Sequence, residues 1–175
     1  MWNVKDSESW HALYVITGHE EKVKQALEMT LEDEIQFIIP KRELRERKAG
    51  KWHMVKRKLF PGYILLKGKI TEEEYYKIKK VPILSKMLID DDGPLKIDEK
   101  ELEMLNILIN KKDGNIGIST VYKENEKVKV VDGPLMGLEG NIQSIDARKG
   151  RAKVAIEFLG ETRIVQLGVE FVDKI

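Results

Sequence analysis

Four cationic residues crowd one short window near the C-terminus: Arg148, Lys149, Arg151 and Lys153, with only glycine and alanine between them. Arg151 and Lys153 share one face of a strand because side chains alternate, and Gly150 allows another backbone to approach closely. A cluster of this kind binds phosphates, and arginine also reaches guanine edges through two hydrogen bonds. The window therefore predicts an RNA-binding hairpin. Charge alone leaves the alternative of a solvated hairpin tip.

A second cationic stretch covers residues 41–58, where nine lysines and arginines face two glutamates. Ala49-Gly50 in its middle indicates a long hairpin. Two interpretations stay open: the hairpin faces DNA, or its lysines keep an edge strand from aggregating. The second is favoured for residues 42–51, and a mixture of both for residues 56–58. The sequence does not decide whether Trp52-His53 is exposed on this hairpin.

Residue types that carry catalysis or bind metals are sparse. The chain has no cysteine, which excludes disulfides, thiolate metal sites and cysteine nucleophiles. Its three histidines, His11, His19 and His53, have no metal-ligand spacing. The serines lie in no nucleophile motif, and no phosphate-binding Gly-x-x-x-x-Gly-Lys is present. We therefore expect no enzyme, no metal and no cofactor.

The overall composition is that of a globular protein. Of the 175 residues, 42% are hydrophobic and 35% charged, with a net charge of +1, so any nucleic-acid contact must come from local clusters. No apolar run approaches the ~20 residues of a membrane span, and the first residues do not form a signal peptide. We expect a cytoplasmic monomer with no membrane contact.

Hydrophobic periodicity predicts a mixed α/β arrangement in the first 110 residues. Thr71–Glu74 and Asp98–Glu101 read as capping boxes that open helices. The expected elements are a strand at 10–17, a helix at 20–31, a strand at 35–39, a hairpin at 41–58, a strand at 64–66, a helix at 71–80, a strand at 86–89 and a helix from 98 to 109.

The pattern changes after residue 110. Residues 111–120 contain two glycines and no clear periodicity, so they are read as a linker. Five short strands without a helix then predict a small closed barrel: 128–131, 140–145, 151–158, 162–167 and 169–172. The predicted domains are therefore 1–110 and 121–175, joined by 111–120.

Two motifs in this order carry a family resemblance. Residues 127–140, with the turn Asp132-Gly133-Pro134, resemble the KOW motif at the start of small SH3-like barrels. Residues 55–64, which end in Phe60-Pro61-Gly62-Tyr63-Ile64, resemble the most recognisable run of the NusG N-terminal domain. On these residues the chain is identified as a member of the NusG/Spt5 family. The resemblance implies an α+β fold: an N-terminal βαβ-type sandwich domain followed by an SH3-like KOW β-barrel.

The resemblance also implies a function: a non-enzymatic transcription elongation and antitermination factor. Its N-terminal domain would bind the clamp helices of the largest RNA polymerase subunit, and its KOW domain a second partner. The second half of the barrel, residues 146–168, resembles the LoaP branch of specialised NusG paralogues, which implies recognition of a structured RNA hairpin. The implied polymerase contacts are Tyr14, Phe60, Tyr63 and Leu65, and the implied KOW docking loop is Leu135, Met136 and Leu138.

Some positions depart from the general NusG pattern. Lys80-Val81-Pro82-Ile83 stands where Asn-Thr-Pro-Gly is typical. In the family the Asn-Thr pair is linked to recognition of the non-template DNA strand, and here a lysine that can bind a phosphate takes its place. The candidate DNA contacts are Lys56, Arg57 and Lys80. Leu135 stands where phenylalanine is usual. Two alternatives stay open: a general NusG-type factor whose KOW domain docks a ribosomal protein or Rho, and a KOW-containing ribosome-associated protein.

Overall fold

The computed structural model describes residues 10–31, 35–81, 85–87, 89–90, 93–94, 96–109 and 113–173. Contacts between residues divide the chain into two compact units. Unit 1 comprises Met1–Pro40 and Phe60–Asp98, and unit 2 comprises Lys41–Leu59 and Glu99–Ile175. The hairpin and the last helix of the predicted N-terminal domain therefore group with the C-terminal strands. Independent folding of residues 121–175 stays a prediction.

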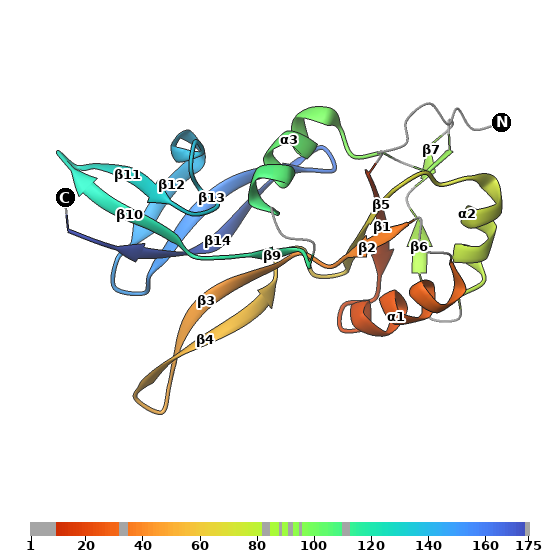
Figure 1. Cartoon of the computed structure of the whole chain (residues 1–175), viewed down its shortest axis with the longest axis horizontal. Coiled ribbons are helices and arrows are strands. Elements are labelled where there is room, and N and C mark those ends of the chain that lie inside the picture. Colours follow the sequence, from red (N-terminus) through yellow and green to blue (C-terminus); the bar gives the residue numbers. More distant parts are fainter. Residues whose placement is uncertain are drawn as a thin grey trace. The chain divides into compact units, whose positions relative to one another are not determined.

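Unit 1 is built around a four-stranded sheet of order β2-β5-β1-β6 (Figure 1). The central strand β1 pairs antiparallel with both β5 and β6. The elements of this unit are β1 (Trp10–Val15), α1 (Glu20–Thr30), β2 (Gln36–Ile38), β5 (Tyr63–Lys67), α2 (Glu72–Lys79), β6 (Ser85–Met87), β7 (Ile89–Asp90) and β8 (Gly93–Pro94).

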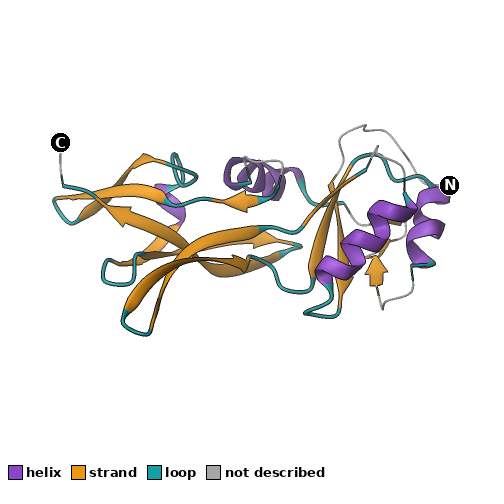
Figure 2. Ribbon diagram, turned by 60° about the horizontal axis from the view of Figure 1, so that its bottom comes forward, coloured by secondary structure: helices purple, strands orange, loops and turns teal. Residues whose placement is uncertain are grey.

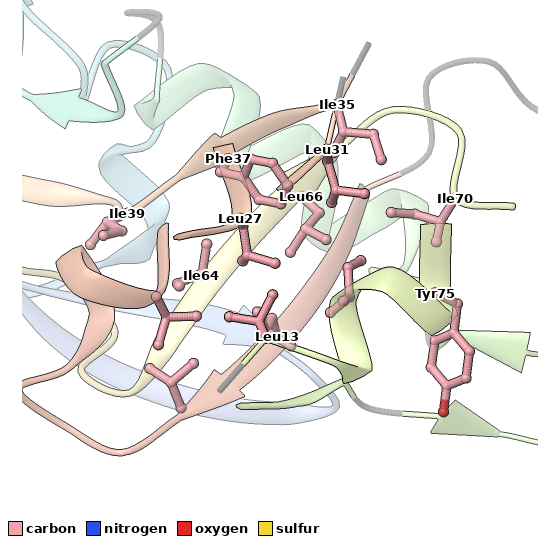
Figure 3. Packing of buried hydrophobic residues seen from close by; sticks show 14 residues of the cluster. Leu13, Leu27, Leu31, Ile35, Phe37, Ile39, Ile64, Leu66, Ile70 and Tyr75 are labelled. Carbon is pink, nitrogen blue, oxygen red and sulfur yellow. The ribbon is translucent and has the colours of Figure 1, made fainter. Parts of the chain in front are cut away.

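The core of unit 1 lies between this sheet and the helices (Figure 3). Leu13 and Ile64 from the sheet pack with Leu27 from α1, and all three are fully buried. The predicted capping box of α2 is confirmed: the Glu74 N–H donates to Thr71 Oγ1, and the Thr71 N–H donates to Glu74 Oε2. The predicted strand at 86–89 corresponds to β6 and β7.

Glu20 connects two glycine turns in unit 1. Its carboxylate is fully buried and accepts hydrogen bonds from the N–H groups of Gly18 and Gly62 at 2.9 to 3.1 Å. Gly62 has φ +91°, and a Cβ atom there would lie 3.2 Å from the Val15 carbonyl oxygen. The Phe-Pro-Gly-Tyr run is thus a turn that needs glycine and is anchored on β1 and α1.

Unit 2 combines a long hairpin, one helix and a curled five-stranded sheet, here called the barrel (Figure 2). The strand order of the barrel is β11-β10-β14-β13-β12. The elements are β3 (Lys41–Lys48), β4 (Lys51–Lys58), α3 (Glu99–Leu108), β9 (Asn115–Ile116), β10 (Ser119–Glu124), β11 (Lys127–Asp132), the 3-10 turn η1 (Glu139–Asn141), β12 (Ile142–Asp146), β13 (Arg151–Phe158) and β14 (Glu161–Phe171).

The predicted strands of the barrel need two corrections. Gly168 does not interrupt β14, so one continuous strand replaces the two predicted at 162–167 and 169–172. The fifth strand is β10, which begins at Ser119 inside the predicted linker. Residues 115–116 of that stretch also form β9, which pairs in parallel with β3. The other predicted strands correspond to β11, β12 and β13; β13 covers 151–158 as expected, and β12 begins at Ile142 because residues 139–141 form η1.

Alternation along β13 explains the barrel core. Ala152, Val154, Ile156 and Phe158 are all fully buried, while the residues between them point outward. Leu135 and Leu138, from the loop after β11, are buried too. The KOW-like motif therefore contributes its leucines to the packing of the barrel.

Candidate nucleic-acid interface

A cationic pocket lies on the outward face of the barrel, where β12, β13 and β14 run side by side. Lys153 pairs with Ser144 on one side and with Gln166 on the other, so these three side chains form a row across the sheet. Together with Lys149 and Arg151 they line a pocket of about 270 Å³. The structure thus brings together three of the four predicted RNA-binding residues.

The turn between β12 and β13 fixes the backbone of Lys149. The Lys149 N–H donates to Asp146 Oδ1 at 2.9 Å, and the Gly150 N–H donates to the Asp146 carbonyl oxygen at 2.9 Å. Gly150 has φ +67°, a conformation that favours glycine. Arg148 is exposed at the tip of this turn and does not line the pocket.

Arg151 is shared between the pocket and the β3–β4 hairpin. One terminal nitrogen donates to Gln166 Oε1 at 2.9 Å, and the other donates to the Arg45 carbonyl oxygen at 3.3 Å. The second nitrogen also lies 3.9 Å from Glu46 Oε1. Arg151 is consequently half-buried, whereas Lys149 and Lys153 are exposed.

Two arginines, Arg57 and Arg151, lie at the carboxylate of Glu46. Arg57 makes two hydrogen bonds with it, at 2.9 and 2.6 Å, and these lower the pKa of Glu46 and raise the pKa of Arg57. Burial and then the nearby guanidinium groups of Arg151 and Arg57 lower the pKa of Arg42. Positive charge therefore exceeds negative charge in this cluster.

The predicted polymerase contacts separate into surface and core residues. Tyr14 and Tyr63 pair across β1 and β5, with their rings edge to face and their centroids 5.4 Å apart. Tyr14 is exposed and Tyr63 is half-buried. Phe60 is only 3% exposed, and Leu65 is fully buried. Only the two tyrosines present ring surface to a partner, and Ile16 is exposed close to Tyr14 in the chain.

The remaining candidates also divide by exposure. In the loop after β11, Met136 is exposed while Leu135 and Leu138 are buried. Among the DNA candidates, Lys56 and Lys80 are exposed, and Arg57 is engaged with Glu46. Of the run that includes Lys80, Pro82 and Ile83 lie outside the described residues.

Two features of this region were missed from the sequence. Gln166 lines the cationic pocket, although no motif singles it out. Its position opposite Lys153 could have been found by aligning the alternation of the last strand with that of residues 151–158. The ion pair between Arg45 and Glu170, 3.0 Å apart, joins residues distant in sequence and has no local signal.

Two further observations on the described residues concern metal-binding side chains and long apolar helices. No group of three histidine, aspartate or glutamate side chains among them is arranged to hold a metal ion. Within the same part of the chain, no helix is both long and apolar enough to cross a membrane.

A mixed α/β unit followed in the chain by a curled five-stranded sheet defines an α+β protein with a NusG-like fold. The structure is similar to a solved one described as "Domain interaction in Thermotoga maritima NusG", with a TM-score of 0.58 and 22% identity, over 92% of this chain and 93% of that one. The family model described as "Transcription termination factor nusG" matches residues 8–106. The chain therefore belongs to the NusG family.

Relatives of known name extend the similarity along nearly the whole chain. The "Transcription termination/antitermination protein NusG" of Bacillus subtilis (strain 168) is 29% identical, over 95% of this chain and 98% of the relative. The protein of the same name from Haemophilus influenzae is 28% identical, over 95% of this chain and 94% of the relative. The similarity thus covers the KOW-like region as well as the N-terminal region.

Proposed function

We propose that this chain is a transcription elongation and antitermination factor that binds RNA polymerase through unit 1 and structured RNA through the barrel. Membership of the NusG family and relatives named as termination/antitermination proteins support the general role. The role is non-enzymatic and cytoplasmic, and the chain acts as a monomer.

The polymerase contact is assigned to the surface around Tyr14 and Tyr63. Their edge-to-face rings offer an aromatic surface, and Ile16 is exposed as well. Aromatic side chains that become buried when a partner binds contribute most of the binding energy in many protein interfaces. The partner is the pair of clamp helices of the largest polymerase subunit, and Lys80 is available to nearby non-template DNA.

The observation that carries RNA recognition is the cationic pocket of the barrel. It combines two exposed lysines, one arginine and one glutamine with a single carboxylate, Asp146, within about 270 Å³. Lysines there neutralise phosphates, and Arg151, whose terminal nitrogens donate to Gln166 and to the Arg45 carbonyl oxygen, adds its positive charge to the pocket. Structured RNA with an opened loop or bulge suits such a site, because regular A-form helices hide their major-groove edges. This role fits the LoaP branch of the family.

The alternative of a general factor whose KOW domain docks Rho or a ribosomal protein has less support. That docking was predicted to use three apolar residues of one loop. Leu135 and Leu138 are buried, so only Met136 of these three residues is exposed; it lines a pocket of about 610 Å³ with Ile107, Ile118 and Pro134. Docking through this loop would therefore use one of its three predicted residues.

The experiment measures binding of the full chain to RNA by fluorescence anisotropy. A pool of RNA hairpins with randomised loops is compared with unstructured oligouridylate, and the bound hairpins are then tested individually. Lys149→Ala with Lys153→Ala is expected to weaken hairpin binding and to reduce the slope of log affinity against log salt by ~1.4 to 1.8. Lys123→Ala with Lys127→Ala, two exposed lysines of the β10–β11 hairpin, is the matched control.

The barrel site is supported if the wild-type chain prefers hairpins to oligouridylate. The Lys149→Ala, Lys153→Ala variant must lose this preference, and the Lys123→Ala, Lys127→Ala variant must keep it. Equal binding of hairpins and oligouridylate by the wild type would overturn the proposal of structured RNA and favour the protein-docking alternative.

A further inference from the structure

The β3–β4 hairpin carries an exposed aromatic and apolar surface that the proposed function does not use. Trp52 is 50% exposed and Met54 is 55% exposed. Residues 52, 54 and 56 lie on one face of β4 because side chains alternate along a strand. Figure 1 shows β3 and β4 as a two-stranded ribbon that ends in the turn between them. We name the surface of Trp52, Met54, Arg47 and Lys56 the Trp52 face.

Cations border this surface on both strands. Arg47 lies directly opposite Trp52 in the antiparallel register, and Arg45 lies opposite Met54. Lys56 follows on the same face of β4, and Lys48 and Lys51 flank the turn. Glu43 lies opposite Lys56, but cations outnumber acids around the apolar side chains.

The negative charges of the hairpin are already engaged. Both carboxylate oxygens of Glu46 accept hydrogen bonds from Arg57, and Glu43 Oε1 accepts one from Asn115 Nδ2 at 2.7 Å. Glu170 pairs with Arg45. In the described part of the chain, Arg47 and Lys56 make no ion pair, so their charge is available to an anionic partner.

We propose that the Trp52 face binds single-stranded RNA, with a base stacked on the Trp52 ring and phosphates on Arg47 and Lys56. Aromatic side chains that alternate with cations are the usual surface for single strands, because every base has a π-face and every nucleotide has a phosphate. Two apolar side chains match the area of one or two bases. They are far smaller than the ~800 Å² per partner of a stable protein interface.

The choice of RNA over DNA rests on the proposed function. The barrel pocket and the hairpin belong to the same compact unit, and Arg151 contacts both of them. A structured RNA bound at the pocket would leave its single-stranded flank close to β3 and β4. The Trp52 face would then hold that flank without reading its sequence.

The test measures binding of the full chain to fluorescently labelled oligouridylate by anisotropy at low salt. Loss of one stacked base in Trp52→Ala is expected to weaken binding about tenfold. Trp52→Tyr keeps an aromatic ring and is expected to bind within about twofold of the wild type. Arg47→Gln with Lys56→Gln is expected to reduce the salt slope by ~1.4, the value for two single-strand phosphate contacts.

Tyr76→Ala is the matched control, because Tyr76 is 59% exposed on α2, where Glu72 and Glu73 lie in the first turn. It is expected to leave binding unchanged. Circular dichroism melting of every variant confirms that each is folded.

Normal oligouridylate binding by a folded Trp52→Ala variant would overturn the proposal. The proposal would also be overturned if oligothymidylate bound more tightly than oligouridylate and if Trp52→Ala weakened only the binding of oligothymidylate. The surface would then be a DNA-binding surface. A response to Trp52→Ala seen only with polyglutamate or anionic vesicles would assign it to a protein or a membrane instead. The barrel proposal is tested separately: it fails if the Lys149→Ala, Lys153→Ala variant binds RNA hairpins as the wild type does.

Discussion

Gly168 of β14 lies directly against the backbone of Glu43 in β3, at the place where the barrel meets the hairpin. A Cβ atom on Gly168 would collide with the Glu43 carbonyl oxygen and would lie 3.0 Å from Ile118 Cγ1. The Arg45–Glu170 ion pair and the hydrogen bond from Arg151 to the Arg45 carbonyl flank this contact. Close backbone approach therefore joins β3 to β14, and glycine makes it possible.

Gly168→Ala is expected to destabilise unit 2 by about 1–3 kcal/mol, because backbone atoms on β3 must move to admit the methyl group. Urea unfolding of the full chain measures this loss. Gly140→Ala is the control, since a Cβ atom at Gly140 meets open space. Equal stability of the two variants would show that β3 and β14 separate freely in solution.

Replacement of Tyr14 and Tyr63 by alanine is expected to lower polymerase affinity by more than about 2 kcal/mol, as for other aromatic anchors. Surface plasmon resonance with core RNA polymerase measures the change. Tyr76→Ala, which truncates an exposed ring on α2, is expected to have no effect.

Phe60 needs a different test because it belongs to the core. Phe60→Ala is expected to cost about 3–5 kcal/mol of stability, so its loss of polymerase binding would follow from unfolding. Wild-type polymerase affinity in a folded Tyr14→Ala, Tyr63→Ala variant would assign the contact to another surface.

Glu20→Ala is expected to destabilise unit 1 by about 2–3 kcal/mol. The substitution leaves the N–H groups of Gly18 and Gly62 without their carboxylate acceptor, and the buried N–H of Gly62 has no access to water in exchange. Chemical denaturation measures the change, with the exposed neighbour Glu21→Ala as the control. Equal midpoints for the two variants would contradict this role of Glu20.

The free energy of unfolding is expected to fall as the pH is lowered, because of His11. It is buried in β1, and burial together with the positive charge of Lys96 lowers its pKa to about 4. In the unfolded chain the pKa is about 6.5, so between pH 6.5 and pH 4 only the unfolded state takes up the proton. The contribution of neutral His11 to the free energy of unfolding is complete above pH 6.5 and is lost as the pH falls. The loss is on the order of 3 kcal/mol at pH 4.

Urea unfolding at a series of pH values measures this dependence. His11→Gln is expected to flatten the curve between pH 6.5 and pH 4, whereas replacement of the exposed His53 by glutamine serves as the control. An unchanged slope in His11→Gln would assign the acid sensitivity to other groups.

Local signals in the sequence were sufficient to predict most of the helices and strands. The Thr71–Glu74 capping box and the Ala49-Gly50 turn act within a few residues, and both lie where they were predicted. Gly168 shows the limit of such signals. A glycine between two apolar runs usually separates strands, but here its missing side chain serves a contact with Glu43, more than a hundred residues away.

The candidate site was predictable to a similar extent. Alternation and charge were enough to group Lys149, Arg151 and Lys153. Burial depends on tertiary packing, so the sequence could not show that Leu135 and Leu138 face the core while Met136 faces outward. The position of Gln166 depends on the register of β13 and β14, which the short turn between them sets, but no motif singled out this glutamine.

The division of the chain into two units has a covalent consequence. The polypeptide passes between them three times, at 40/41, 59/60 and 98/99. A single protease cut at the last passage would leave the β3–β4 hairpin tethered to unit 1 at both of its ends. A fragment that begins at residue 121 would lack the first two residues of β10, the hairpin and α3, and would expose the Gly168 face of β14 to water.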